Sequence, residues 1–317
     1  MNNDIWVISC YFNPLHFRTR RENFRHFAEG LESQGARLLV IEMADAEGDF
    51  DLDASRFHCI RVRGDGLIWQ KERMLNLALE HVPSECTKVV WADGDLLFES
   101  PDWLSRTSAA LEDYVVVQPF DRCIRLPRGH LSYRGETQEG SEPAESFAAC
   151  FARDPSLAHH EIYRNHGHTG FAWAARRDFL DACGFYDRCL TGSSDHLMAH
   201  VFAGALASDC IPKMIGEGHT FARDFAAWAE KAHCLCDGRL GHISGRVLHL
   251  WHGTLGNRRY FSRNQEFKTF DYQPDRDIRM DNSGLWEWTG ASPFLREWSE
   301  AYFASRDEDG SDQSAPT

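Results

Sequence analysis

The chain has 317 residues, enough for one large α/β domain or two small ones with a sizeable buried core. Hydrophobic residues make up 43% and charged residues 26% of it, an ordinary balance for a soluble globular protein. The formal net charge of -14 argues against general nucleic-acid binding, because proteins of that class normally carry an excess of basic residues. A local basic pocket for an anionic ligand stays compatible with this charge.

No stretch approaches the ~20 consecutive apolar residues that span a bilayer. The first residues, from Met1 to Asp4, lack the basic segment and apolar run of a secretory signal. The 10 cysteines are scattered through apolar contexts, so we expect reduced, buried cysteines in a cytoplasmic protein. Cys234 and Cys236 form the only close pair, and a structural zinc site built on paired cysteines is therefore not expected.

Apolar runs and helical periodicity alternate along the chain. Expected strands cover residues 5–10, 38–43, 57–62, 88–92, 114–120, 171–175 and 247–253. Expected helices cover residues 18–31, 68–81, 101–111, 177–183, 195–207, 221–234 and 258–267. This alternation predicts an α/β fold with a doubly wound, mostly parallel sheet. Residues 128–155 show no clear period and are expected to form a long surface loop. Residues 306–317 have the composition of a disordered acidic tail.

The expected strand Lys88–Ala92 is followed by two carboxylates, Asp93 and Asp95, and the apolar sequence then resumes. Burying both carboxylates without a partner would be costly, so a cation is expected beside them. Oxygen ligands suit hard divalent ions such as Mn²⁺ and Mg²⁺, and ligands of open α/β sheets bind at the carboxyl ends of strands. The stretch therefore indicates a metal–diphosphate site, with an ordinary Asp-Gly-Asp turn as the alternative.

Further polar clusters lie where expected strands end or helices begin. They are Asn13-Pro14 with Arg18, Arg20 and Arg21; residues 70–73 with Asn76; residues 192–196; and residues 249–253 with Arg258, Arg259 and Tyr260. A solvated helix face also explains the first cluster, and helix capping with surface charge also explains the second. His249 and His252 have a spacing that suits metal binding, and a hydrogen-bonded core histidine is the alternative for each.

In their order along residues 5–265, these clusters resemble nucleotide-sugar-dependent glycosyltransferases of the GT-A fold, galactosyltransferases among them. The resemblance rests on residues 10–14, Arg73-x-x-Asn76, residues 91–95, residues 170–174, residues 192–195 and residues 249–253. It implies a Rossmann-like, mostly parallel sheet flanked by helices, with a small antiparallel portion on the acceptor side. It also implies one catalytic domain over residues 1–270, with a nucleotide-binding half over 1–120 and an acceptor half over 121–270. Residues 271–305 would form a C-terminal extension.

The resemblance assigns the ligands of a metal ion and of the donor. Asp93 and Asp95 would hold Mn²⁺ or Mg²⁺ against the diphosphate of a UDP-sugar, with His252 as a later metal ligand. Inverting galactosyltransferases carry Met-x-x-His where this chain has His249-x-x-His252, which leaves metal binding by His249 open. The implied donor-binding residues are Asn13 and Pro14 at the base, Lys71, Arg73, Asn76 and Asp93 along the nucleotide, and Trp173 at the sugar.

Asp195 is the residue that the resemblance assigns to catalysis. In inverting members an acidic residue at a helix start takes the proton from the acceptor hydroxyl, which is general-base chemistry. Ser193 and Ser194 precede Asp195 here in place of the family's acidic cluster, so a helix N-cap is the alternative for Asp195. The expected activity is transfer of a hexose from a UDP-sugar to a hydroxyl of a carbohydrate or another acceptor.

Three other functions share parts of this pattern. A haloacid-dehalogenase-type phosphatase carries Asp-x-Asp after its first strand, whereas here the motif follows the fourth expected strand. A sugar nucleotidyltransferase needs a glycine-rich phosphate loop near the N-terminus, and residues 10–14 contain no glycine. A sugar-nucleotide-binding protein without catalysis is disfavoured because Asp95, Asp195 and His252 occur together.

Overall fold

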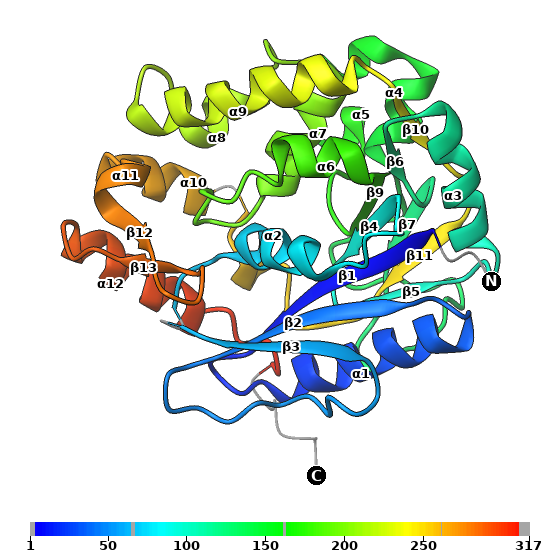
Figure 1. Ribbon diagram of the computed structural model, residues 1–317, viewed down its shortest axis with the longest axis horizontal. Coiled ribbons are helices and arrows are strands. Elements are labelled where there is room, and N and C mark those ends of the chain that lie inside the picture. Colours follow the sequence, from blue (N-terminus) through cyan, green and yellow to red (C-terminus); the bar gives the residue numbers. More distant parts are fainter. Residues whose placement is uncertain (1–3, 65–66, 161–162, 261, 311–317) are drawn as a thin grey trace.

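The computed structural model describes residues 4–64, 67–160, 163–260 and 262–310 (Figure 1). The strands are β1 (Ile5–Phe12), β2 (Leu38–Ala44), β3 (His58–Arg63), β4 (Lys88–Ala92), β5 (Leu96–Phe98), β6 (Val116–Gln118), β7 (Arg122–Arg125), β8 (Ala144–Glu145), β9 (Ala172–Arg176), β10 (Leu240–His242), β11 (Arg246–His249), β12 (Ile278–Met280) and β13 (Trp286–Trp288). The helices are α1 (Arg18–Ser33), α2 (Lys71–His81), α3 (Trp103–Asp113), α4 (Phe147–Arg153), α5 (Tyr163–His166), α6 (Arg177–Cys183), α7 (Ser194–Phe202), α8 (Cys210–Ile215), α9 (Thr220–Cys236), α10 (Ser262–Phe267), α11 (Pro274–Asp277) and α12 (Pro293–Ala304). Short 3-10 helices cover Pro155–His159, Gly256–Arg258 and Lys268–Phe270.

A seven-stranded sheet with the order β10-β6-β9-β4-β1-β2-β3 forms the centre of the described fold. β4, β1, β2 and β3 run parallel to one another, and β6 runs parallel to β10, while β9 lies between β4 and β6 and is antiparallel to both. A smaller mixed sheet has the order β5-β11-β7-β8, and β12 pairs with β13. The expected α/β class, with a mostly parallel sheet flanked by helices and a small antiparallel portion, is confirmed.

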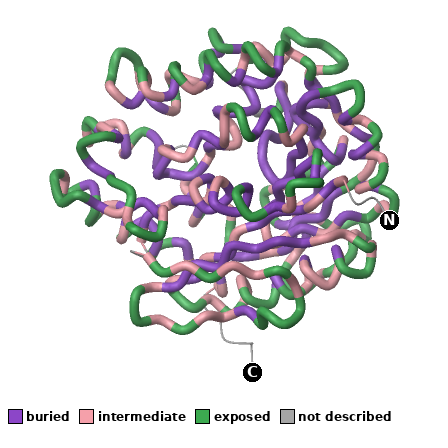
Figure 2. Tube along the Cα trace, in the orientation of Figure 1, coloured by how far each residue is buried: buried purple, intermediate pink, exposed green. Residues whose placement is uncertain are grey.

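Apolar layers cover both faces of the large sheet, because successive side chains of a strand point to opposite sides. In β4, Val89 and Trp91 pack into the core that also contains side chains of α2, α6, α7 and α9. Val90 and Ala92 pack into the second core, with α1 and α3. Figure 1 shows α1 and α2 on opposite sides of the sheet, and Figure 2 shows the buried strands between them. This double cover explains the nearly continuous apolar sequence of the central strands.

Two segments differ from their expected character. Residues 128–155 contain β8 and α4, so the expectation of a structureless loop is wrong for 144–153. Residues 306–310, expected to begin a disordered tail, instead pack against the body of the protein, where Glu308 is 1% exposed. Residues 311–317 of that expected tail lie outside the described residues. Among the described helices, none combines the length and the apolar character needed to cross a membrane.

The turn after β4 approaches α1 closely at Gly94. A Cβ atom on Gly94 would stand 2.6 Å from Cδ2 of Phe24, whose ring is buried. Gly94→Ala should therefore lower the free energy of unfolding by about 1–3 kcal/mol, as overpacking of a core does. Gly256→Ala is the matched control, because no atom lies within 4 Å of its Cβ position. Urea unfolding compares the two variants, and equal stabilities would contradict this packing.

Candidate active site

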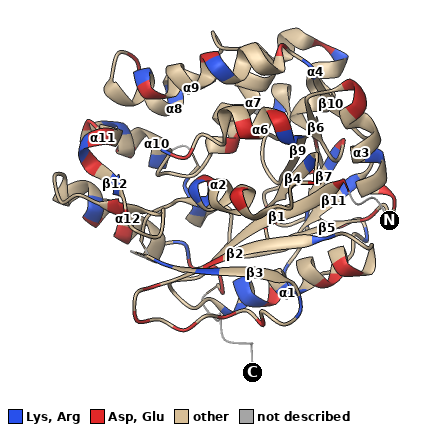
Figure 3. Ribbon diagram, viewed as in Figure 1, with Lys and Arg blue, Asp and Glu red and all other residues tan. Residues whose placement is uncertain are grey.

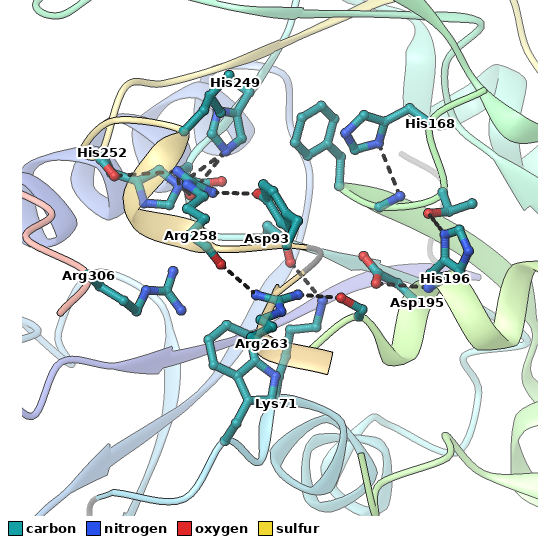
Figure 4. Close-up of a pocket in the computed structure, with 18 of the residues that line it drawn as sticks. Lys71, Asp93, His168, Asp195, His196, His249, His252, Arg258, Arg263 and Arg306 are labelled. Carbon is teal, nitrogen blue, oxygen red and sulfur yellow. Dashed lines mark hydrogen bonds and ion pairs between the residues drawn. The ribbon is translucent and has the colours of Figure 1, made fainter. Parts of the chain in front are cut away.

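A cavity of about 1020 Å³ lies at the carboxyl ends of β1 and β4. Among its lining residues are Lys71, Asp93, Asp95, Asp195, His249 and His252, all of which were candidates from the sequence. Ligands of open α/β sheets bind at this end of the strands, where loops from several strands meet. The structure therefore brings residues from four distant segments of the chain to one hollow (Figure 4).

Three donor atoms converge at one end of the cavity. Oδ2 of Asp95 lies 2.9 Å from Nε2 of His252 and 3.7 Å from Nε2 of His249. The two Nε2 atoms are 3.2 Å apart. Octahedral bonds of about 2.1 Å place neighbouring donor atoms about 3 Å apart, which this spacing matches. The second carboxylate oxygen of Asp95, Oδ1, is buried with no hydrogen-bond partner among the described residues, so the group fits a divalent cation.

Strand pairing places these donors beside each other. β5 follows Asp95 directly and pairs antiparallel with β11, so that Leu96 lies opposite His249. The backbone N–H of Leu250 donates a hydrogen bond of 2.8 Å to the carbonyl oxygen of Asp95. His252 follows in the loop after β11 and is 6% exposed. The register of β5 on β11 therefore determines the distance between the carboxylate and the imidazoles.

The two carboxylates after β4 have different surroundings. Burial opposes ionisation of Asp95, but the imidazoles of His249 and His252 outweigh it and hold the pKa of Asp95 below its usual range. Burial raises the pKa of Asp93, against the effect of the Lys71 ammonium, whose Nζ lies 3.1 Å from Oδ1. Burial also lowers the pKa of His249 well below its usual value, against the effect of the Asp95 carboxylate. Asp93 thus pairs with Lys71, whereas Asp95 faces the histidines.

Asp195 lies in the first turn of α7 and lines the same cavity. Its Oδ1 accepts a hydrogen bond of 2.9 Å from the backbone N–H of His196. Its Oδ2 faces Gly170, where a Cβ atom would stand only 2.5 Å away, so a side chain at Gly170 would displace the carboxylate. Ser193 occupies the N-cap position, and the N-cap alternative for Asp195 is therefore wrong. Figure 4 shows Asp93 and Lys71 between Asp195 and the histidine pair.

Backbone strain and ring stacking also mark this cavity. Phe171 and Ser193, which both line it, have φ values of 81° and 70°, in the left-handed region that non-glycine residues rarely adopt. Such strain is commonly kept at functional sites. The Phe171 ring stacks on His168 at 3.9 Å and on His249 at 4.7 Å between ring centroids. This stack joins the wall that carries Asp195 to the wall that carries the histidine pair.

The residues expected to hold the base and the sugar do not line this cavity. The amide of Asn13 donates hydrogen bonds to the hydroxyl of Tyr11, to Asp51 and to a backbone carbonyl, which fixes its own loop. Asn13 and Pro14 border a separate small pocket. Trp173 is 1% exposed and packs in the core. The structure therefore gives these three residues supporting positions and does not bring them to the candidate site.

Helix α2 presents only one of its faces to the cavity. Lys71 and Met74, three residues apart, line the hollow. Arg73 and Asn76 lie on another face, where both donate hydrogen bonds to Oδ2 of Asp187, at 3.2 Å and 2.9 Å. The expected contacts of Arg73 and Asn76 with a nucleotide are therefore not made from their positions in this structure.

Basic side chains surround the hollow, and among them only Lys71 was predicted as a site residue. The basic lining residues are Arg20, Lys71, Arg125, Arg164, Lys213, Arg258, Arg263, Lys268 and Arg306, against the acidic residues Asp93, Asp95, Asp195 and Glu308. Figure 3 shows charges of both signs on the outer helices and loops. The cavity is thus locally basic in an acidic protein, which suits an anionic ligand. Arg258 already belonged to a polar cluster of the sequence, and Arg263, five residues further on, was an additional sequence signal.

No protein-family model matches the chain, and no curated protein matches it in sequence. Drosophila β1,4-galactosyltransferase 7, as a mutant bound to manganese, UDP-Gal and xylobiose, gives a TM-score of 0.36 at 12% identity, with 63% of this chain and 62% of that chain covered. Mannosyl-3-phosphoglycerate synthase from Rubrobacter xylanophilus gives a TM-score of 0.39 at 10% identity, with 84% of this chain and 73% of that chain covered. 4-Diphosphocytidyl-2C-methyl-D-erythritol synthase from Anaerococcus prevotii gives a TM-score of 0.33 at 9% identity, with 95% of this chain and 96% of that chain covered. The chain thus spans less than two thirds of the galactosyltransferase.

Glu72 is a buried carboxylate beside the site, and it makes stability depend on pH. Burial, opposed by Lys71, raises its pKa to about 7. Between the unfolded pKa of about 4.3 and the folded pKa, the folded state holds a proton that the unfolded state releases, so stability falls as pH rises. The free energy of unfolding of Glu72→Gln, relative to that of the wild type, should therefore rise by about 2–3 kcal/mol from about pH 5 to about pH 8.

Chemical unfolding at the two pH values measures this gain. Glu80→Gln is the control, because Glu80 lies on the same helix but is exposed. A stability difference between Glu72→Gln and the wild type that stays constant over this range would contradict the raised pKa.

Proposed function

We propose that the protein is a metal-dependent glycosyltransferase that moves a hexose from a UDP-sugar to a hydroxyl group of a carbohydrate or another acceptor. The observation that carries the proposal is one cavity that contains the Asp95–His249–His252 group, a basic lining and the carboxylate of Asp195. A cation site surrounded by basic residues suits a diphosphate, and a separate carboxylate suits a proton acceptor. The order of these motifs along the chain, as in GT-A enzymes, supports the same activity.

The ligand set favours Mn²⁺ over Mg²⁺. Mg²⁺ binds through oxygen ligands and keeps several waters, whereas imidazole nitrogens suit transition metals. Asp95, His249 and His252 would supply one oxygen and two nitrogens, which leaves open positions for diphosphate oxygens. Asp93 would act through its ion pair with Lys71.

Two cations flank the turn after β4 and would bind the diphosphate. Arg258 contacts the imidazole of His252, and Lys71 contacts Asp93. A third, Arg263, contacts the hydroxyl of Ser193 next to the start of α7. A bound divalent ion would act as a Lewis acid on the departing diphosphate, and these side chains would hold the same group in position. The basic lining therefore serves binding and leaving-group stabilisation.

Asp195 would act as the general base of an inverting displacement. The acceptor oxygen attacks the anomeric carbon while the bond from that carbon to the diphosphate oxygen breaks. The proton of the acceptor hydroxyl passes to the carboxylate of Asp195, which lines the cavity on the wall of α7. Because Gly170 has no side chain, the carboxylate of Asp195 has room to lie beside it. A single displacement from the opposite face inverts the anomeric centre.

Removal of the Asp95 carboxylate should abolish the dependence of UDP binding on Mn²⁺. The wild type should bind UDP tightly with Mn²⁺ and weakly with a chelator, as measured by isothermal titration calorimetry. Asp95→Ala should lose at least about 100-fold in affinity in the presence of Mn²⁺, since one of three protein ligands is gone. Asp178→Asn, an exposed residue of α6, is the control. Unchanged affinity of Asp95→Ala would refute the assigned metal site.

Asp195→Asn should separate binding from turnover. This variant should keep the UDP affinity of the wild type, yet lose about 10²-fold or more in the rate of sugar transfer or donor hydrolysis. Single-turnover measurements with UDP-sugars and Mn²⁺ would follow the release of UDP. Wild-type turnover in Asp195→Asn would remove this residue from the mechanism. Tight UDP binding with no turnover in the wild type would instead indicate a binding protein.

A further inference from the structure

A second cluster of metal-binding side chains lies on the wall of the cavity that carries Asp195. One ring nitrogen each of His166, His196 and His200 and the Sγ of Cys210 all lie within 4.8 Å of one another. The three rings pack edge to face, with centroids 4.9–5.3 Å apart. His166, His200 and Cys210 are each less than 5% exposed. These four residues are here called the His₃Cys cluster.

Hydrogen bonds orient each histidine of the His₃Cys cluster through Nδ1. Nδ1 of His166 lies 2.9 Å from the carbonyl oxygen of Gly167, and Nδ1 of His200 lies 2.8 Å from that of Ala158. Nδ1 of His196 lies 3.2 Å from the hydroxyl of Thr169. The two carbonyl oxygens can only accept, so they hold the proton on Nδ1 of His166 and His200 and leave the lone pair on Nε2, as in histidines that bind metals. Nε2 of His200 is buried and has no hydrogen-bond partner among the described residues.

The cluster combines elements that are separate in the sequence. His196 and His200 are one turn apart on α7 and therefore project from the same face of that helix. His166 ends α5, and Cys210 begins α8. The pair His196-x-x-x-His200 is a chelating spacing on a helix, and it is visible in the sequence once the helix is known.

We propose that the His₃Cys cluster is a zinc site, distinct from the Asp95–His249–His252 group. Three neutral nitrogens and one thiolate form a closed tetrahedral ligand set of the kind that Zn²⁺ takes in structural sites. Bonds of about 2.0 Å to nitrogen and 2.3 Å to sulfur separate the donor atoms by about 3.5 Å, which small side-chain movements reach from the present spacing. The thiol of Cys210 releases its proton to solvent when the metal binds.

This site would hold the start of α7 in place. His196 follows Asp195 directly, so a bond from His196 to a metal that also binds α5 and α8 would tie the first turn of α7 to both helices. The backbone N–H of His196 is the donor to Oδ1 of Asp195. Zinc would therefore act on Asp195 as a positioning element and would take no part in the chemistry. The zinc proposal itself stands without the proposed transferase activity.

Cobalt is the probe that separates the two sites, because only the His₃Cys cluster offers a thiolate. Chelator-treated wild-type protein is titrated with Co²⁺ and then with Zn²⁺, and absorption spectra are recorded. The expected result is the d–d absorption of tetrahedral Co²⁺ with a thiolate-to-cobalt charge-transfer band at one equivalent. Zn²⁺ should then bleach both features, because its d shell is full. Absence of the charge-transfer band with excess Co²⁺ would overturn the proposal.

Matched variants assign the band to its residues. Cys210→Ser should abolish the charge-transfer band, whereas Cys236→Ser should keep it. Cys236 is the matched control because both thiols are buried beside a backbone carbonyl oxygen, Cys210 at 3.5 Å and Cys236 at 3.4 Å. A band that survives Cys210→Ser would contradict the assignment. His200→Gln keeps the thiol and should weaken Co²⁺ binding beyond the ~10–100-fold that outer-shell changes cost. This variant decides the question if Cys210→Ser does not fold.

The Asp95→Ala variant tests the zinc proposal separately from the transferase proposal. This variant should retain the full charge-transfer band, while it loses Mn²⁺-dependent UDP binding. Loss of the band in Asp95→Ala would show that the two groups are not separate metal sites.

Discussion

The site depends on keeping the carboxylate of Asp95 beside the imidazoles of His249 and His252. β4 belongs to the large sheet and β11 to the smaller one, and β5 connects them because it follows Asp95 and pairs with β11. Oδ1 of Asp95 is buried with no hydrogen-bond partner among the described residues, which is costly without a cation. The pairing of β5 with β11 therefore holds three donor atoms at a spacing that suits a divalent ion, and the cavity forms around that point.

Charge is distributed so that an acidic protein has a basic hollow. Part of this basic lining is compensated within the chain, since Glu308 pairs with Arg20 at 2.6 Å and with Arg306 at 2.8 Å. Glu308 also lies 3.7 Å from Nδ1 of His252, so the last described residues close one side of the hollow. Arg258 also lines the hollow, where it contacts the imidazole of His252. The proposed binding of a diphosphate and the closure by the chain end therefore use the same kind of interaction.

The sequence predicted the parts of the site that depend on local pattern. Apolar runs that end in charged or histidine residues mark strand ends, and these placed Asp95 and His252 at one edge of the sheet. Which side chains of a helix point into the cavity was harder to predict. Arg73 is only two residues from Lys71 yet lies on another face of α2. Long-range pairing was not predictable, since the composition near Glu308 is that of a disordered tail, and contacts with residues far away in the sequence, such as Arg20, order it. The α/β class itself followed from the alternation of elements.

Asp95, His249 and His252 are proposed to hold a divalent ion that also binds a diphosphate. Electron–nuclear double resonance of Mn²⁺ added to the protein with UDP tests this assignment, because it reports which nuclei surround the ion. We expect nitrogen couplings from two imidazoles together with phosphorus couplings from UDP in the same spectrum. The nitrogen couplings should disappear in a His249→Ala, His252→Ala double variant. Phosphorus couplings without nitrogen couplings in the wild type would show that these histidines do not hold the ion.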